Sequence, residues 1–334
     1  MSVRLSVSTV TPVYSGAAYL RALVEKLNDI RNQWTGLDLP FELVESIFVN
    51  DDAIDASDEV LAALASEFDW VKVITNSKNF GQHPATIAGI LHCSGDWIVT
   101  LDEDLQHDPA FIEKLLKNAF LNRSDIVYAR PEAPVHGAKL RDLGSVAIKN
   151  GLSLLTRNKN IPLFNSFRLI RGTVARAAAC VCSHETYFDI ALSWFTNRVG
   201  AVHLPMRDPR FIQTGKSGYN LFKLLAHARR MVISSQTKIL RVVALIGFFV
   251  IVADITCGSL LFVFTLWHRD ATEARGWASL FLATLFFGGL TLLMSSIILE
   301  YLTGVVLHIQ GKPTFFIIDR SSDALAVKFY QKLS

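Results

Sequence analysis

The chain has 334 residues, of which 51% are hydrophobic, and its mean hydropathy is +0.32. This apolar fraction is above the roughly 45–50% of ordinary soluble proteins, so a purely soluble globular protein is disfavoured. The net charge of +3 is too small to indicate nucleic acid as a partner. The four cysteines lack the paired spacing of a zinc site.

The first 120 residues alternate β-rich runs with helical patterns. The predicted strands are 5–12, 41–50, 71–77 and 97–101, the first ending at Pro12, and the predicted helices are 17–30, 58–68, 83–93 and 109–120. Strands that alternate with helices of this length are typical of an α/β domain. We therefore predict a mostly parallel, Rossmann-like sheet with both faces covered.

Polar clusters follow each predicted strand, at residues 11–15, 50–55, 76–83 and 102–108. Ligands of open parallel sheets bind beyond the carboxyl ends of the strands. The clusters therefore predict a binding site at that edge of the sheet, and a binding domain in place of a scaffold.

Two carboxylates in the last cluster, Asp102 and Asp104, have the chemistry of a metal site. Mg²⁺ or Mn²⁺ prefers oxygen ligands and retains waters and substrate phosphates in its shell. The alternative is a solvated turn that caps the next helix, which explains Asp108 and Pro109 but not the two earlier acids. We expect Glu103, between the two, to point away from the ion.

The C-terminal third predicts a membrane anchor. The run 242–267 has Asp254 as its single charge, and the run 277–299 has none. Each is long enough for a bilayer, which takes roughly 20 apolar residues. We predict a transmembrane hairpin of helices 240–267 and 277–300, preceded by an amphipathic interfacial helix over 219–239. A helix packed on the globular domain is the alternative for 219–239.

Charge placement predicts the orientation of this anchor. Basic residues gather between Arg207 and Arg241, where lipid headgroups are their expected contacts, while the loop 268–276 has only two. The N-terminal residues lack the pattern of a signal peptide. We therefore expect a multi-pass protein of the inner, cytoplasmic membrane, with the domain 1–218 and the tail 308–334 both in the cytoplasm.

Several segments in order resemble the family 2 glycosyltransferases, specifically the membrane-anchored branch that transfers a sugar to a polyprenyl phosphate. The segments are TPVYSGAAYL (11–20), FVNDDAIDAS (48–57), KNFGQHPATIAGI (78–90), VTLDEDLQHDP (99–109), FRLIRGTV (167–174), GKSGY (215–219), LEYLTGVV (299–306) and GKPTFFII (311–318). The resemblance implies a GT-A fold, a nucleotide sugar donor of the UDP-linked type, a polyprenyl phosphate acceptor and a homo-oligomer.

The resemblance also implies roles for individual residues. Asp102 and Asp104 would hold the metal on the donor's diphosphate, with Asp104 counted among the catalytic residues. The other donor-binding residues would be Pro12, Tyr14, Asp51, Asp52, Asn79, Gly81 and Gln82, with Asp51 on the base.

The chain departs from the family pattern at several positions. Asn50 replaces the first Asp of the turn, and Asp52 with Ala53 replaces Gly-Ser. Asn165-Ser166 stands where the family carries Gly-Asp, whose Asp is a proposed base. Ile212 occupies the position of a family Arg, and Arg210 lies two residues earlier.

The loss of the Asp at 166 need not abolish activity, because a phosphate monoester is mostly ionised at pH 7 and such an acceptor needs positioning more than deprotonation. We predict that Arg168, Arg210 and Lys216 hold the lipid phosphate, with a hydrogen bond from Ser217. Ser166, at the position of the family's proposed base, is counted among the catalytic residues. Asp189 is the reserve candidate for a base, and an orienting or structural carboxylate is the alternative for it.

Two other functions stay open. A processive polysaccharide synthase would carry a Q-x-x-R-W block and more membrane spans, which the sequence lacks. A membrane-anchored sugar-nucleotide binder without turnover would accommodate the changes at 50, 52, 53 and 166.

Overall fold

The computed structural model describes residues 4–37, 39–132, 159–183, 186–205, 277–309 and 313–317, with isolated residues between 249 and 267. The chain divides into two compact units. The first unit comprises Met1–Ser234 and Pro313–Ser334, and the second comprises Ser235–Lys312.

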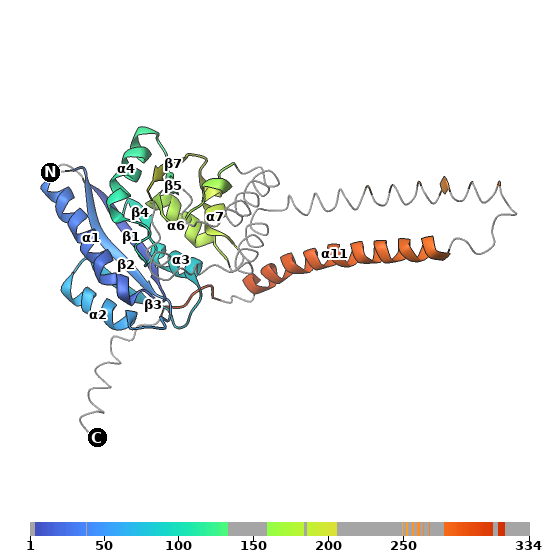
Figure 1. The fold of residues 1–334 in the computed structure, drawn as a ribbon, viewed down its shortest axis with the longest axis horizontal. Coiled ribbons are helices and arrows are strands. Elements are labelled where there is room, and N and C mark those ends of the chain that lie inside the picture. The colour runs from blue at the N-terminus through green and yellow to red at the C-terminus, as the bar shows by residue number, and fades with distance from the viewer. Residues whose placement is uncertain are drawn as a thin grey trace, which may run out of the picture. The chain divides into compact units, whose positions relative to one another are not determined.

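The first unit is built on a seven-stranded sheet (Figure 1). Its strands, in the order in which they lie side by side, are β3 (Val71–Thr75), β2 (Phe41–Asn50), β1 (Leu5–Val13), β4 (Trp97–Thr100), β6 (Arg168–Arg171), β5 (Ile126–Pro131) and β7 (Val199–Leu204). β6 is antiparallel to both neighbours, and all other pairs are parallel. The predicted α/β class and mostly parallel sheet are confirmed.

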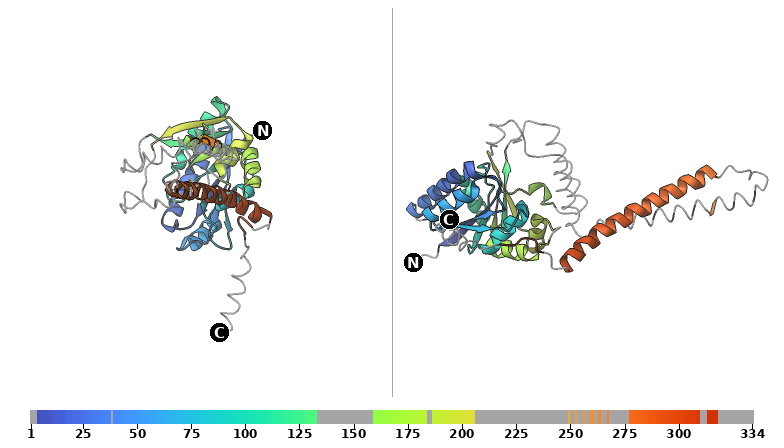
Figure 2. Two further views of the ribbon diagram at one scale, coloured as in Figure 1. Left: turned by 90° about the vertical axis from the view of Figure 1, so that its right-hand side faces the viewer. Right: turned by 90° about the horizontal axis from the view of Figure 1, so that it is seen from below.

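Helices cover both faces of this sheet (Figure 2). The face toward α1 (Ala17–Gly36), α2 (Ser57–Glu67) and α4 (Ile112–Leu121) has one core cluster, and the face toward α3 (Gln82–His92), α6 (Gly172–Val181) and α7 (Phe188–Phe195) has the other. β4 alternates between them, since Trp97 and Val99 belong to the first cluster and Ile98 to the second. This is the period of two that a strand buried on both faces requires.

Pro12 does not end the first strand as predicted, because β1 continues to Val13. The backbone groups of Val10 and Pro12 point toward β4, where Leu101 N–H donates to the carbonyl of Val10. β4 itself ends at Thr100. At the level of Pro12, no strand among the described residues therefore lies on that side of β1, because β4 has already ended. The missing N–H of Pro12 thus costs no hydrogen bond between strands.

Two helices differ from the sequence prediction. α1 runs six residues further, to Gly36, because its apolar stripe continues to the buried Trp34. The helix predicted from Pro109 begins with the 3-10 turn η1 (Pro109–Phe111) and becomes α-helical at Ile112. Asp108 caps this turn as predicted, since its Oδ1 accepts from the Ala110 N–H at 3.2 Å.

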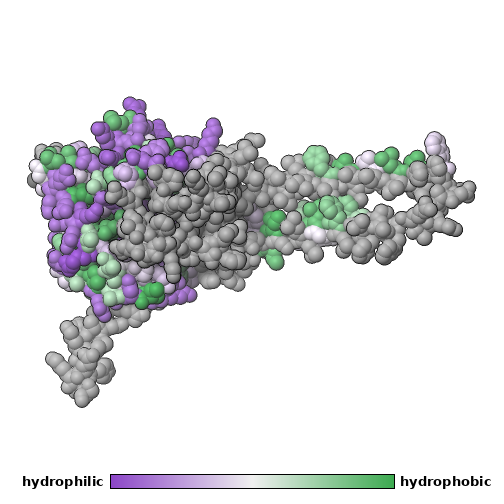
Figure 3. Space-filling view, viewed as in Figure 1, coloured by the Kyte–Doolittle hydropathy of each residue, from purple (hydrophilic) through white to green (hydrophobic). Residues whose placement is uncertain are grey.

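The second unit contains α11 (Trp277–Ile309), which includes the second apolar run and extends beyond the predicted end at 300. Leu280, Phe286 and Ile298 on this helix are exposed, and its coloured residues in Figure 3 are mostly hydrophobic. Within the described parts of the chain, no helix meets the combined length and apolar character of a membrane span. Residues 219–239, where the interfacial helix is predicted, lie outside the described residues, as do 318–334 and most of 240–267. The hairpin and the domain boundaries therefore stay predictions.

Candidate functional site

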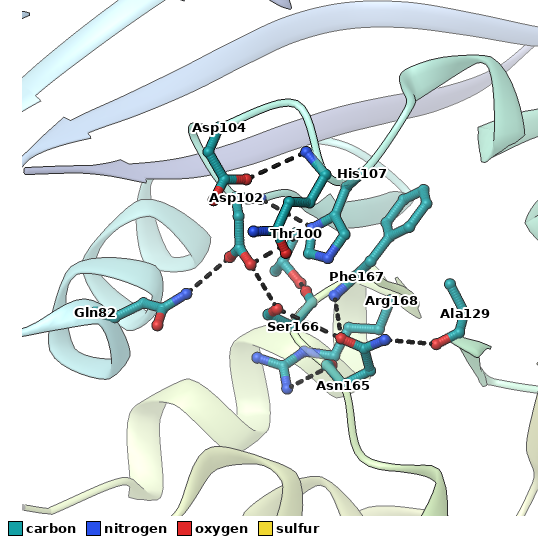
Figure 4. A network of polar contacts seen from close by, with 11 residues as sticks. Gln82, Thr100, Asp102, Asp104, His107, Ala129, Asn165, Ser166, Phe167 and Arg168 are labelled. Carbon is teal, nitrogen blue, oxygen red and sulfur yellow. Dashed lines mark hydrogen bonds and ion pairs between the residues drawn. The ribbon is translucent and has the colours of Figure 1, made fainter. Parts of the chain in front are cut away.

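The polar segments predicted to share one edge of the sheet do meet there. Tyr14 follows β1, Asp51 follows β2, and Asp102 follows β4, so the three lie at carboxyl ends of parallel strands. A further segment reaches the same edge from β6, because that strand runs in the opposite direction and begins there. Figure 4 shows the network around Asp102, in which the turn after β4 meets the start of α3 and the segment before β6.

Asp102 is the centre of this network. Its Oδ1 accepts a hydrogen bond of 2.7 Å from Nε2 of Gln82, at the start of α3. Its Oδ2 accepts one of 2.8 Å from Oγ of Ser166, just before β6 (Figure 4). Three residues assigned to the donor, the metal and catalysis are therefore in direct contact.

Ser166 is held from both sides. Thr100 Oγ1 donates to the carbonyl of Ser166, and Nδ2 of Asn165 donates to the carbonyl of Ala129 at 2.7 Å. The segment is thus fixed to β4 and β5 at once. A hydroxyl at 166 can donate to Asp102, whereas the carboxylate that the family carries here could not, and this explains how the replacement is accommodated.

Asp104 is 8% exposed, and its Oδ1 accepts from the N–H of Gln106 at 3.2 Å. Leu105 between them has φ +60°, a left-handed conformation that is costly for a branched side chain. Among the described residues, no group of three His, Cys, Asp or Glu side chains could hold a metal ion. The assignment of Asp102 and Asp104 to an ion stays a prediction, in which the two carboxylates hold the ion and water and phosphate oxygens fill the rest of its shell.

His107 was not predicted as a site residue. It is 4% exposed, its Nδ1 accepts from the backbone N–H of Asp102 at 3.1 Å, and its ring stacks on Phe167 with centroids 5.0 Å apart. It braces the turn that carries the two carboxylates. Its only signal in the sequence is its place within an acidic cluster.

Asp51 holds the loop before α3. It is 2% exposed, and its carboxylate accepts hydrogen bonds from Nδ2 of Asn76 at 2.8 Å, Phe80 N–H at 3.0 Å and Gly81 N–H at 2.7 Å. Gly81 has φ +97°, so a glycine is required for this turn. The predicted contact of Asp51 with the base stays a prediction, while its carboxylate demonstrably organises the loop that carries Asn79 and Gly81.

The departures at 50 and 52 have local explanations. Nδ2 of Asn50 donates to Oδ1 of Asp58 at 2.9 Å, and its Oδ1 accepts from Ala53 N–H at 3.0 Å. An Asp at 50 could not donate to Asp58. Asp52 is exposed with φ +57°, which fits the glycine usual in the family and which Asp tolerates better than most residues.

Tyr14 and Asn79 remain available to a ligand. The side chain of Tyr14 is 41% exposed, and Asn79 is exposed as well. Both follow strands at the edge where Asp102 lies, in agreement with their predicted place in a donor pocket. Their contacts with a donor stay predictions.

Arg168 and Asp189 were assigned to separate roles, but the structure pairs them. Nη1 of Arg168 donates to Oδ1 of Asp189, which also accepts from the hydroxyl of Tyr128 at 2.7 Å. The two charged side chains are 3% and 2% exposed. Burial opposes the charge of Arg168, yet the carboxylate of Asp189 raises the guanidinium pKa above its ordinary value. The pair favours the structural alternative stated for Asp189.

Tyr128 is neutral in this arrangement, because burial and the neighbouring Asp189 raise its pKa well above 10. Nε of Arg168 is buried without a hydrogen-bond partner among the described residues. The other predicted acceptor residues, Arg210, Lys216 and Ser217, lie outside the described residues.

Similar proteins include two curated transferases that match most of the chain. The SfII prophage-derived bactoprenol glucosyl transferase of Shigella flexneri is 26% identical, over 94% of this chain and 97% of its own length. The undecaprenyl-phosphate 4-deoxy-4-formamido-L-arabinose transferase of Pseudomonas syringae pv. syringae is 29% identical, over 96% of this chain and 93% of its own.

Among solved structures, the glucosyl-3-phosphoglycerate synthase of Mycobacterium tuberculosis, in complex with Mn²⁺, UDP-glucose and phosphoglyceric acid, is 16% identical with a TM-score of 0.49. The similarity covers 70% of this chain and 79% of the synthase. Its identity and TM-score are too low to bear on function. The model of Glycosyl transferase family 2 matches residues 8–178, just over half of the chain. Together with the sheet and the Asp102 network, this match establishes that the chain belongs to glycosyl transferase family 2.

Proposed function

We propose that this glycosyltransferase moves a sugar from a nucleoside-diphosphate sugar to a polyprenyl phosphate at the cytoplasmic face of the membrane. The observation that carries the proposal is the contact of Asp102 with Gln82 and Ser166. The names of the curated relatives, a bactoprenol glucosyl and an undecaprenyl-phosphate arabinose transferase, support the lipid acceptor.

The reaction is a single displacement at the anomeric carbon. A phosphate oxygen of the lipid forms the new bond to this carbon, the bond to the donor's diphosphate breaks, and the nucleoside diphosphate leaves with the electron pair. The configuration inverts. The acceptor is mostly ionised near pH 7, so the reaction needs no side-chain base, and Ser166 in place of an Asp is compatible with turnover.

The charges at the site support the part of the proposal that includes a cation. Helix N-termini often bind phosphates, but the amides of residues 14–17, which lead into α1, donate to side chains of the chain itself. Their acceptors are Glu103, Ser57 and Asp55. The amides of 80 and 81 before α3 are likewise taken by Asp51.

A diphosphate at this edge therefore meets carboxylates and few free amides. We assign Asp102 and Asp104 to a Mg²⁺ or Mn²⁺ ion. Bound there, such an ion neutralises the charge that develops on the leaving diphosphate. Gln82 and Ser166 orient the Asp102 carboxylate, and His107 fixes the backbone of the turn.

For the acceptor, we place the lipid phosphate against Arg210 and Lys216, with a hydrogen bond from Ser217. Arg168 belongs to the same predicted set, although its charge is shared with Asp189. The exposed apolar side chains of α11 suit a lipid environment, which supports the proposed hairpin, the inner-membrane localisation and access to a membrane-bound acceptor. A homo-oligomer remains part of the proposal.

The proposal is tested with the full-length protein in native-like membranes, with radiolabelled UDP-sugars, polyprenyl phosphate and Mn²⁺. Transfer of label into an acid-labile, organic-extractable lipid, abolished by EDTA and restored by Mn²⁺ or Mg²⁺, is the expected result. Long polymer would identify a processive synthase. Tight donor binding without label transfer would identify a binder and overturn the proposal.

A further inference from the structure

We propose that Glu103, the middle residue of the D-x-D turn, is a positioning residue that joins the metal-binding turn to the loop after β1. This inference rests on the proposed function, because it concerns how that site holds its donor. Glu103 is neither a metal ligand nor a group that touches the reacting atoms.

The contacts of Glu103 are with the backbone of another segment. Its Oε2 accepts from Tyr14 N–H at 2.8 Å, and both carboxylate oxygens lie 3.2 Å from Ser15 N. Hydrogen bonds from backbone amides to a charged carboxylate are stronger than neutral ones. The carboxylate thus clamps two consecutive amides of the loop that places Tyr14.

Gly16 makes this approach possible. A Cβ added at Gly16 would lie 2.7 Å from Oε2 of Glu103 and 3.1 Å from its Cβ. A larger residue at position 16 would therefore displace the Glu103 carboxylate from its present place. The Glu103 carboxylate and Gly16 together hold the β1–α1 loop close to the turn that follows β4.

The consequence for the site follows from chain connectivity. Asp102 and Asp104 flank Glu103, so a shift of its carboxylate moves the backbone of both, and on the other side it moves Tyr14. One side chain therefore sets the spacing between the predicted nucleotide pocket and the predicted diphosphate site. Its loss should weaken donor binding, while the reaction of bound donor proceeds at its usual rate.

The test compares Glu103→Ala and Glu103→Gln with the control Glu67→Ala in the full chain. Glu67 is exposed and contacts only a surface partner, Arg21, among the described interactions. The measurements are UDP affinity by calorimetry with and without Mn²⁺, KM and kcat for label transfer, and hydrogen exchange of a peptide that covers 14–16.

We expect Glu103→Ala to raise the UDP Kd and the donor KM about tenfold, with kcat within about twofold. Exchange at 14–16 should speed up even without metal and nucleotide. The UDP Kd, the donor KM and the exchange rate of Glu103→Gln should lie between those of the wild type and of Glu103→Ala, because its remaining carbonyl oxygen still accepts a hydrogen bond from an amide. Glu67→Ala should match the wild type.

The inference is overturned if Glu103→Ala leaves exchange at 14–16 and UDP affinity unchanged. A fall in kcat at constant KM would also overturn it, since that result indicates a direct role in the reaction. A wild type that binds no UDP would count against the proposed donor. In that event the exchange of 14–16 alone decides the role of Glu103.

Discussion

Oγ of Ser166 lies 2.8 Å from Oδ2 of Asp102, and this hydrogen bond joins the start of an antiparallel strand to the end of a parallel one. The two residues are 64 positions apart in the chain. The contact links the turn to which we assign the metal with the segment that stands in place of the family's Gly-Asp. Variants at Ser166 therefore test whether this hydroxyl serves the site in place of that Asp.

Ser166→Ala should lower kcat/KM for label transfer about tenfold, because a hydrogen bond to a charged group is worth about 1.5–3 kcal/mol. Ser166→Thr keeps the hydroxyl and should retain most of the activity. The Mn²⁺ concentration for half-maximal activity should rise in the Ala variant alone. Wild-type activity in Ser166→Ala would show that this hydroxyl does not serve the site.

Asp189→Asn should act on stability more than on the reaction. Breaking the buried pair with Arg168 leaves a guanidinium without its counter-charge, at a cost of about 3 kcal/mol. Denaturant unfolding measures this loss, and turnover is normalised to folded protein. Replacing both partners by apolar residues, Arg168→Met with Asp189→Leu, should recover much of the stability.

A different result for Asp189→Asn would identify a catalytic role for this residue. If Asp189→Asn kept wild-type stability and lost more than about a hundredfold in kcat, the residue would be the base that the sequence analysis held in reserve. Full turnover per folded molecule would end that assignment.

Asn50→Asp should weaken the turn after β2, because a second carboxylate would then face Asp58 where Asn50 now donates a hydrogen bond of 2.9 Å. We expect a loss of about 1 kcal/mol in unfolding free energy and a higher donor KM. Combining Asn50→Asp with Asp58→Asn again places an amide donor, now at 58, opposite a carboxylate acceptor, now at 50. The double variant should therefore be more stable than Asn50→Asp alone, and strict additivity in this cycle would contradict the interpretation.

The surroundings of Glu45 predict that the protein loses stability in acid. It is 2% exposed and accepts from Ser8 Oγ at 2.9 Å, Ser94 N–H at 2.6 Å and Lys72. Burial raises its pKa, but these hydrogen bonds outweigh burial and bring the pKa from 4.5 to about 2. A carboxyl group whose pKa is lowered on folding stabilises the protein above its unfolded pKa, so this contribution is lost as the pH falls from about 4.5 to 2.

Thermal unfolding of the wild type and of Glu45→Gln between pH 7 and pH 2.5 measures this contribution. Glu45→Gln should be less stable by about 1–3 kcal/mol at pH 7. The difference should shrink below pH 4.5. A difference independent of pH would mean that the charge of Glu45 is not what stabilises this corner of the sheet.

The sequence predicted most of the sheet and the edge at which the site lies. Periodicity located β1, β2, β3 and β4 to within a few residues, and the polar residues after them converge as parallel topology requires. Local patterns sufficed because each unit is a strand, a turn and a helix that are contiguous in the chain.

Contacts between distant segments could not be predicted in this way. The partner of Asp189 is Arg168, and that of Glu103 is the backbone of 14 and 15. Neither pairing leaves a trace in spacing, since each depends on which strands become neighbours. His107 was missed for the same reason, because its role depends on burial against Phe167.

The reversed direction of β6 has a consequence for how this enzyme class can vary. β5 ends and β6 begins at the same edge of the sheet, and the residues just before β6 lie beside Asp102. Substitutions at 165 and 166 would therefore alter the surroundings of Asp102 while the strand register stayed intact. Variation next to Asp102 can therefore be concentrated in the few residues that precede β6.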